Sequence, residues 1–323
     1  MHYWLIILYI LLALVALCVA FGIYLVLSSF TRREHYEEDF EGYVNHFIAH
    51  GKEDIAQRMS SARKKLIQLP SEDVWIKSRD GLHLHAKLIA PKEDTNKTII
   101  LVHGYHSYRC NDFSVIWEYY YQNNWRILLV DQRTHGESEG RFICFGVKER
   151  YDICGWVDYI RTRFGQQSLV CLHGISMGSA TVTMAQSLKE LEGKITAVVA
   201  DCGFVSPKQQ FSHMFSRMHL PKIPLFYFAN FITKLFCGYW FGEVSCKEEL
   251  TTSKTPILFI HGELDNFVPT ECSKINYEAC SSPKTLWIVS GGRHGDAIYI
   301  NETGYFAHLD QLYESVGVSS LSC

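Results

Sequence analysis

The chain has 323 residues, a formal net charge of −3, 47% apolar residues and 20% charged residues. These values are typical of a globular protein, and the absence of any basic run predicts no nucleic-acid partner. Setting aside an apolar N-terminus and a short linker, roughly 260 residues remain. That length is enough for one large domain with a deep core.

Eleven cysteines are spread along the chain, an odd number, and no two of them form a CxxC pair. Cys171 and Cys202 lie in apolar, strand-like runs, where cysteine behaves as a small hydrophobic residue. This pattern favours a reduced compartment over a framework of disulfides.

The N-terminal segment from Tyr3 to Leu27 contains no charged residue. A helix of this length can cross a hydrocarbon core of about 30 Å. A cleaved signal peptide fits less well, because no Lys or Arg precedes the run, the run is too long and no A-x-A site follows. A buried core helix would need an apolar cavity around all its faces. We therefore expect residues 1–30 to be a single-pass transmembrane anchor.

Arg32 and Arg33 follow the apolar run immediately, whereas no basic residue precedes it. The positive-inside rule then predicts that the C-terminal domain lies in the cytoplasm.

Residues 31–70 are polar and helical in pattern, with an apolar stripe made of Phe40, Tyr43, Phe47 and Ile48. The pattern predicts a juxtamembrane helical connector. Its stripe either docks on the domain, or the segment is a solvated spacer.

The remaining residues, 71–323, alternate between strand-like and helix-like segments. Residues 74–76 and 82–89 flank the turn-like Arg79-Asp80-Gly81 and predict an antiparallel hairpin. Continuous apolar runs, typical of strands buried on both faces, then follow at 98–102, 126–130, 168–172, 195–200, 256–260 and 285–289. The alternation predicts an α/β fold with a mainly parallel sheet and helices on both faces.

The interval between Asp201 and Pro256 is much longer than the other connections and is rich in Phe, Met, Tyr and Pro. A connection of this length is usually functional. We expect a helical cap insert over about residues 205–250, above the carboxyl edge of the sheet. Pro221 and Pro224 predict two helical pieces with a bend between them.

The strongest chemical signal is the sequence Gly174-Ile175-Ser176-Met177-Gly178, between a strand and the helix-like residues 179–188. A G-x-S-x-G turn in this context presents a serine in a strained, exposed geometry. A serine hydroxyl needs a base, and His294 follows the last strand. Asp265, with Glu263 as its competitor, follows the strand before it. The sequence therefore predicts a catalytic triad in which Ser176 is the nucleophile, His294 the base and Asp265 the acid that orients it.

An oxyanion hole is expected from two backbone amides. One belongs to Met177, directly after the nucleophile, and the other to Tyr105, in the loop after the strand 98–102. His103 and His106 are metal-ligating residue types, but no third ligand clusters with them in the sequence. We therefore expect no metal and no cofactor.

Together these motifs resemble the α/β-hydrolase superfamily over roughly residues 70–315. The resemblance rests on His103-Gly104, on Asp131-Gln-Arg133-Thr-His135-Gly136-Glu-Ser138, and on the three predicted triad positions. It implies that Asp131, Arg133 and His135 are structural.

Within the superfamily, the segment Pro-Ile-Leu-Phe-Ile-His-Gly-x-x-Asp-x-Phe-Val-Pro is similar to membrane-anchored bacterial hydrolases. Those resemble monoacylglycerol lipases, carboxylesterases and so-called serine aminopeptidases. One departure is Gly-Gly-Arg293-His294, where many relatives have Gly-Ala-Gly-His.

The resemblance and the motifs lead to the expectation of a serine hydrolase that cleaves small-molecule or lipid-like carboxylic esters at a membrane. One alternative is a peptidase or amidase of the same fold. Another is a non-catalytic membrane scaffold, against which the full Ser-Asp-His set argues. Fold alone does not decide between them, and the sequence carries no signal of an oligomeric state.

Overall fold

The computed structural model describes residues 2–33 and 36–318. At its centre lies an eight-stranded sheet with the order β1-β2-β4-β3-β5-β6-β7-β8. β1 and β2 form the expected antiparallel hairpin, β2 runs antiparallel to β4, and the other neighbours are parallel. The strands are β1 Glu72–Lys77, β2 His83–Ile89, β3 Lys97–Val102, β4 Arg126–Val130, β5 Leu169–Ile175, β6 Ala197–Asp201, β7 Ile257–Gly262 and β8 Lys284–Val289.

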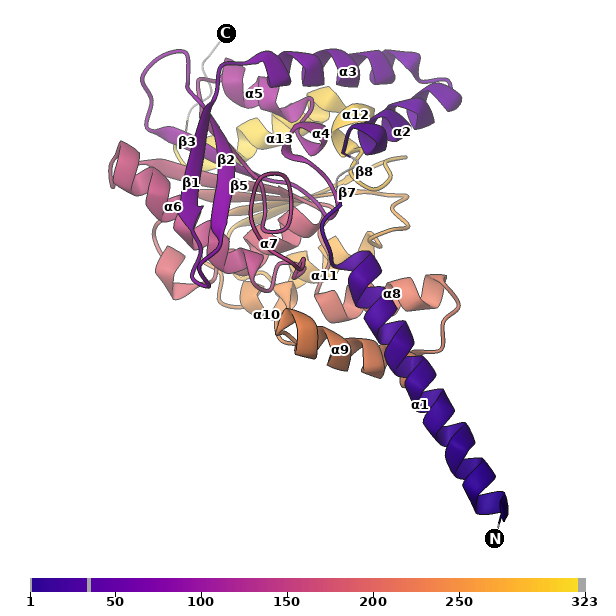
Figure 1. The fold of residues 1–323 in the computed structure, drawn as a ribbon. Helices are drawn as coiled ribbons and strands as arrows, with labels where there is room; N and C mark the ends of the chain where they lie inside the picture. The colour runs from indigo at the N-terminus through magenta and orange to yellow at the C-terminus, as the bar shows by residue number, and fades with distance from the viewer. Residues whose placement is uncertain (1, 34–35, 319–323) are drawn as a thin grey trace.

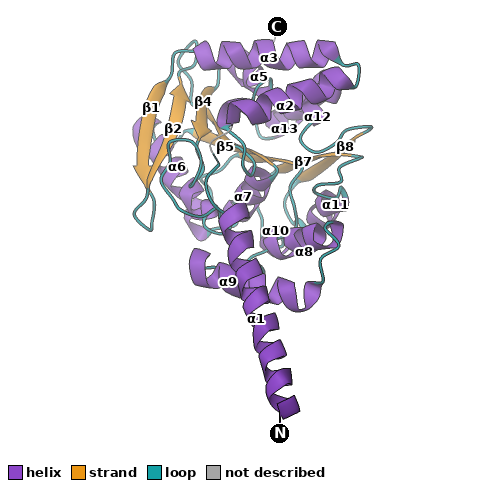
Figure 2. Cartoon of the chain, turned by 45° about the vertical axis from the view of Figure 1, so that its right-hand side comes forward, coloured by secondary structure: helices purple, strands orange, loops and turns teal. Residues whose placement is uncertain are grey.

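Helices connect the parallel strands and cover both faces of the sheet, as Figures 1 and 2 show. The helices are α1 His2–Ser29, α2 Tyr36–Ala49, α3 Glu53–Gln68, α4 Arg109–Asp112, α5 Ile116–Gln122, α6 Glu149–Phe164, α7 Met177–Ala185, η1 Lys189–Leu191, α8 Pro207–Arg217, η2 Lys222–Phe226, α9 Tyr227–Cys237, α10 Cys246–Leu250, α11 Glu271–Ala279, α12 Ala297–Ile300 and α13 Glu302–Ser315. The α/β fold class expected from the sequence is confirmed.

Successive side chains of each buried strand enter two different cores, because side chains alternate across a sheet. In β3, for example, Ile100 and Val102 pack with α6, α7 and the cap helices, whereas Ile99 and Leu101 pack with α2–α5, α12 and α13. Burial on both faces explains why these strands are continuous apolar runs in the sequence.

α1 leaves the body of the molecule and ends in a free N-terminus (Figure 1). It is long and apolar enough to cross a membrane, with a mean hydropathy of 3.0 in an 18-residue window. Its two halves have different surroundings. The side chains of Tyr3–Leu17 are exposed, whereas Cys18, Val26 and the following Phe30 are buried.

The junction at the end of α1 is packed into the domain rather than standing outside it. Phe30 is fully buried and stacks on Phe211 of α8, with ring centroids 5.3 Å apart, and its ring lies edge-on to Phe145 at 5.2 Å. Its carbonyl accepts a 2.6 Å hydrogen bond from the amide of Ile143. The domain's packing therefore extends across the boundary that the sequence suggested at residue 30.

The segment 31–70 forms the helical hairpin of α2 and α3, and it docks on the domain. Phe40 and Phe47 of the apolar stripe are buried in the core on that face of the sheet, but Ile48 is 45% exposed and lies outside the contact. The solvated-spacer alternative therefore does not describe this structure.

The long insert forms α8 and the pair η2–α9, with Pro221 and Pro224 at the bend between them, and a third helix, α10, which the sequence did not predict, ends the insert. α9 lies directly against α1, and Figures 1 and 2 show the two helices side by side. The ten cysteines within the described residues are buried and free, and Cys323 lies outside them.

Candidate active site

Ser176 occupies the tight turn between β5 and α7. Its backbone has φ 56° and ψ −116°, an unfavourable conformation for a residue with a side chain. The turn requires glycine on both sides. A Cβ on Gly174 would lie 2.2 Å from the carbonyl oxygen of Gly178, and a Cβ on Gly178 would lie 1.9 Å from the carbonyl oxygen of Val102. The backbone therefore presents the Ser176 hydroxyl at the carboxyl edge of the sheet, at the start of a helix.

His294 and Asp265 reach the same edge from the ends of β8 and β7. Nε2 of His294 lies 2.8 Å from Oγ of Ser176, and Nδ1 lies 2.6 Å from Oδ2 of Asp265. Because the Asp265 carboxylate accepts a hydrogen bond from Nδ1–H, the proton of the neutral imidazole stays on Nδ1 and Nε2 is left to accept the serine proton. Glu263, the competing acid, instead bonds to Ser290 and the amide of Gly291.

A second histidine, to which the sequence analysis assigned no role, also contacts Asp265. Nε2 of His261 lies 3.1 Å from Oδ2 of Asp265, while Nδ1 accepts from the Ser273 hydroxyl at 2.6 Å. Burial would raise the pKa of the Asp265 carboxyl, but hydrogen bonds from His261 and His294 outweigh it and lower the pKa below its usual range. Asp265 therefore remains ionised at neutral pH.

Both residues predicted to supply the oxyanion donors lie beside Ser176. Met177 is the first residue of α7, and Tyr105 follows Gly104, whose position for a Cβ is 3.3 Å from the Cβ of Ser176. In the described part of the chain, neither amide donates a hydrogen bond to a protein acceptor. Amides that lack a protein partner beside a nucleophile can bind an anion.

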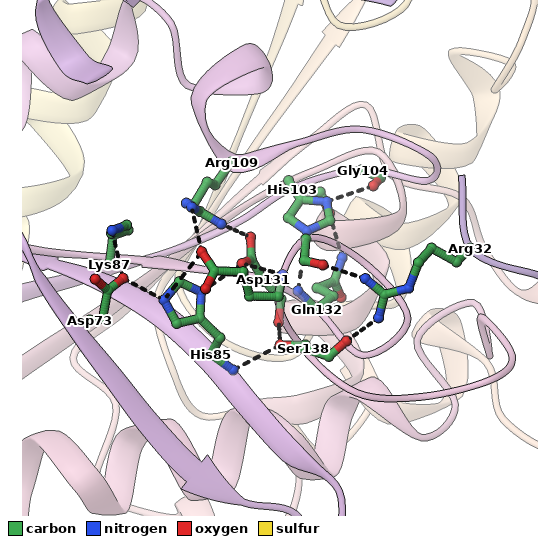
Figure 3. Close-up of polar contacts among 12 residues, drawn as sticks. Arg32, Asp73, His85, Lys87, His103, Gly104, Arg109, Asp131, Gln132 and Ser138 are labelled. Atoms are coloured by element: carbon green, nitrogen blue, oxygen red, sulfur yellow. Dashed lines mark hydrogen bonds and ion pairs between the residues drawn. The ribbon is translucent and has the colours of Figure 1, made fainter. Parts of the chain in front are cut away.

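The end of α1 holds the loop that carries Tyr105. The Tyr105 hydroxyl donates to the carbonyl oxygen of Ser29 at 2.7 Å, and Nε2 of His106 donates to that of Thr31 at 3.0 Å. The Arg32 guanidinium donates to the carbonyl oxygens of Gly136 and Ser138, as Figure 3 shows for Ser138. We call residues 29–32 the strap, because they bind both the Tyr105 loop and the loop at Gly136–Ser138.

A polar network behind the loop fixes it from the other side (Figure 3). Nδ1 of His103 donates to the carbonyl oxygen of Gly104, and its Nε2 accepts from the Gln132 amide. Asp131 accepts from Arg109 and from Nδ1 of His85, the latter at 2.7 Å. These contacts support the structural role that the resemblance implied for Asp131.

His135 and Arg133 are also bound within the protein. Nε2 of His135 accepts from the His106 amide at 3.2 Å, and burial lowers its pKa well below the usual value, which keeps that nitrogen unprotonated. Arg133 donates two 2.7 Å hydrogen bonds to Asp152.

Two sets of three side chains in the described residues lie close enough to share an ion. The first contains Cys202 with Asp265 and His294, and the second contains Asp73, His85 and Glu137. Burial raises the pKa of the Cys202 thiol well above its usual value, so the ligating thiolate is disfavoured.

In the second set both ring nitrogens of His85 are already bonded to carboxylates. These bonds outweigh burial and raise the pKa of His85, which favours the imidazolium, a form that cannot bind a metal. The donor chemistry of both sets therefore fits internal hydrogen bonding.

A cavity of about 290 Å³ opens in front of Ser176 and His294. One of its walls comes from α2, through Asp39, Phe40 and Tyr43. Oδ2 of Asp39 and the Tyr43 hydroxyl are buried atoms without a hydrogen-bond partner. Burial raises the pKa of Tyr43 well above its usual value, so the hydroxyl keeps its proton. The sequence placed these residues in the connector and gave them no part in the site.

On the other side of Ser176, beneath the cap, the free space is much smaller. A cavity of about 10 Å³ lies there, lined by residues that include Phe145, Met177 and Met214 of α8. This volume corresponds to about one water molecule. Most of the space available to a ligand is thus on the α2 side.

Comparisons with known proteins agree with this architecture. Residues 97–219 match the family model of the α/β hydrolase fold. YqkD of Bacillus subtilis (strain 168) is 28% identical over 246 residues, which are 76% of this chain and 80% of YqkD. The solved structure of the Pyrococcus furiosus esterase Pf2001 is similar with a TM-score of 0.63 and 22% identity, covering 78% of this chain and 93% of the esterase. The acylaminoacyl peptidase of Pyrococcus horikoshii is similar with a TM-score of 0.55 and 17% identity, covering 80% of this chain and 44% of the peptidase.

The parallel sheet and the serine turn between β5 and α7 have the architecture of the α/β-hydrolase fold, and residues 97–219 match the family model of that fold. The solved esterase and peptidase structures share this fold with the chain.

Proposed function

We propose that the protein is a serine hydrolase that cleaves small carboxylic esters through an acyl-enzyme. The observation that carries the proposal is the hydrogen-bonded series Ser176–His294–Asp265 beside an open cavity. His294 takes the proton as Oγ of Ser176 attacks the acyl carbon, and Asp265 stabilises the imidazolium. His294 then gives this proton to the departing alcohol. A water molecule, activated in the same way, releases the acid and restores the serine.

The negative oxygen of each tetrahedral intermediate would be bound by the amides of Tyr105 and Met177. Both amides are without a protein acceptor in the described chain, so they need not break a bond to receive it. Donors fixed in this way stabilise charge that develops in the transition state.

A small ester is favoured over a peptide by the shape of the site. The cavity of about 290 Å³ is at the lower end of ordinary ligand pockets, and α2 covers it where a polypeptide would need a groove. Asp39 and Tyr43 add two unpartnered polar atoms to a wall that also contains Phe40 and Tyr299. The proposed substrate is therefore largely apolar but carries a polar group, and its bulk lies against α2 rather than under the cap.

The nucleophile is tested by Ser176→Ala with p-nitrophenyl butyrate as substrate. We expect kcat to fall to background, a loss on the order of 10⁶-fold, with the fold retained. Ser187→Ala, at a serine whose hydroxyl bonds to the carbonyl of Glu249, is the matched control and keeps wild-type turnover. Wild-type turnover by the Ser176→Ala variant would disprove the mechanism.

The ester assignment is tested with wild-type protein on two substrates that share an acyl group. We expect p-nitrophenyl butyrate to be cleaved with a much higher kcat/KM than butyryl p-nitroanilide. Alanine p-nitroanilide serves as an aminopeptidase substrate. Faster cleavage of either anilide would favour the amidase or peptidase alternative.

We further propose that α1 anchors the enzyme in a membrane and is retained in the mature protein. A removable signal sequence fits poorly with the burial of Val26 and Phe30, because cleavage would remove side chains from the core. The expected cytoplasmic orientation depends on Arg32 and Arg33. Arg32 also has another role, because it donates hydrogen bonds to carbonyl groups of the domain.

A further inference from the structure

The cap and the anchor form one continuous apolar surface. α9 packs along the second half of α1 at a close crossing, where a Cβ on Gly22 would lie 2.9 Å from Cγ1 of Ile232. Figures 1 and 2 both show α9 beside α1, at the end of the molecule from which α1 emerges. Whatever surrounds the first half of α1 must therefore come close to α9.

The free part of α1 is too short to cross a bilayer without the cap. The exposed segment Tyr3–Leu17 spans about 22 Å at about 1.5 Å per residue. A hydrocarbon core is about 30 Å thick. The remaining distance, about 8 Å, must be covered by the part of α1 that is packed against the cap, or the bilayer must thin around the helix at an energetic cost.

The outward face of the cap is apolar, as a surface in contact with the hydrocarbon of a bilayer must be. Tyr227, Phe231 and Leu235 are spaced by four residues along α9 and are 62%, 54% and 67% exposed. Ile223 in η2, just before them, is 75% exposed. Residues four apart share one face of a helix, so these side chains form an apolar stripe that no part of the described chain covers.

The charges near the stripe also suit a lipid surface. The sequence of α9 contains no acidic residue, and its one charged side chain, Lys234, forms a 3.5 Å ion pair with Glu243. In the preceding helical segments Arg217 donates to the carbonyl oxygen of Asn266, and Lys222 is exposed beside Ile223. Basic side chains beside an apolar face are attracted to the phosphates of lipid headgroups.

We propose that the exposed face of η2 and α9 is immersed in the lipid bilayer beside α1, to a depth of roughly 8 Å into the hydrocarbon. The inference rests on the proposed membrane anchor and adds a second membrane contact to it. The bilayer is favoured over a second copy of the chain because the stripe continues the lipid-facing surface of α1.

The test places an environment-sensitive NBD fluorophore on the full chain in phosphatidylcholine–phosphatidylglycerol vesicles. The probe is attached to the introduced cysteine of Phe231→Cys in a Cys323→Ser background, in which the ten remaining native cysteines are buried. Leu12→Cys, on the free part of α1, is the positive control. Ile67→Cys is the negative control, because it is 52% exposed on α3, at the opposite end of the molecule.

We expect lipids brominated near the headgroup end of the acyl chain to quench the probe at position 231 by at least twofold, and not the probe at 67. Quenching at 12 without quenching at 231 would overturn the immersed cap and leave the anchor standing. No quenching at 12 would overturn the anchor, and the immersed cap with it. A blue-shifted but unquenched probe at 231, lost when the protein is diluted in excess lipid, would instead identify a second copy as the occupant.

Discussion

Two buried carboxylates near Ser176 have opposite pKa shifts, and the difference follows from their partners. Asp265 accepts hydrogen bonds from His261, His294 and two backbone amides, which lower its pKa despite burial. Asp201 has a bond from Tyr305 to one oxygen, while its Oδ1 has no partner. Burial, which the Tyr305 bond only partly offsets, raises its pKa to about 6. The first site stabilises a charge and the second disfavours one.

The raised pKa of Asp201 predicts a specific dependence of stability on pH. The pKa of Asp201 in the folded protein lies above its value of about 3.9 in the unfolded chain. The stability that the protonated carboxyl contributes is therefore fully present below about pH 3.9 and is lost as the pH rises through about 6. Asp201→Asn cannot ionise, so the variant should lack the loss of stability that the ionisation of Asp201 causes as the pH rises. We expect the variant to gain on the order of 1–3 kcal/mol relative to wild type between pH 4 and pH 7.5.

Denaturant unfolding in detergent at several pH values measures this difference. Asp158→Asn is the control, because Asp158 is an exposed residue of α6 that pairs with Lys194. Identical pH slopes for Asp201→Asn and wild type would show that Asp201 is not the group responsible.

At the scale of elements, the strap makes the end of α1 part of the site. It binds the Tyr105 loop and the loop at Gly136–Ser138, so weakening it should move the Tyr105 amide. We expect Arg32→Gln and Tyr105→Phe to lower kcat by about 10–100-fold with KM within twofold, because displacements of about 1 Å can cost 10²-fold. Steady-state kinetics with p-nitrophenyl butyrate measure both parameters.

Affinity for a boronic acid that mimics the tetrahedral intermediate should fall in proportion to kcat/KM, an effect that a loss of folded protein would not produce. Arg79→Gln, which removes an ion pair to Glu190 away from the site, is the control for lost charge. Arg32→Lys should restore part of the rate. Equal kcat and inhibitor affinity in all variants would contradict a positioning role.

The elements that the sequence predicted well are those governed by local rules. The strands appeared as continuous apolar runs, and the glycines around Ser176 indicated a turn in which no larger residue fits. The partners of α1 and α2 could not be predicted in this way. The stripe of Phe40 and Phe47 indicated that α2 has a buried face. It did not indicate that Tyr43 would line the cavity, because the cavity brings Tyr43 together with Ser176, more than one hundred positions along the chain.

For the molecule as a whole, the N-terminal 70 residues belong to the same folded unit as the sheet. The family model matches only residues 97–219, yet α2 forms a wall of the cavity and the strap holds the loop of Tyr105. The α2 wall of the cavity and the strap therefore both come from residues outside that match. If the N-terminal segment were regarded as a separable anchor, the contribution of α2 and the strap to the site would be overlooked.

The hydrogen bond between the Phe30 carbonyl and the Ile143 amide can report whether the oxyanion site in turn affects the strap. Coupling between two sites is reciprocal, so if the strap steadies the oxyanion donors, an occupied oxyanion site must steady the strap. A fluorophosphonate attached to Ser176 places an anionic oxygen there. Hydrogen exchange of the Ile143 amide should then slow in the labelled full-length protein, while amides of the free Tyr3–Leu17 segment remain unchanged. Unchanged exchange at Ile143 would mean that the catalytic site and the end of the membrane helix are energetically independent.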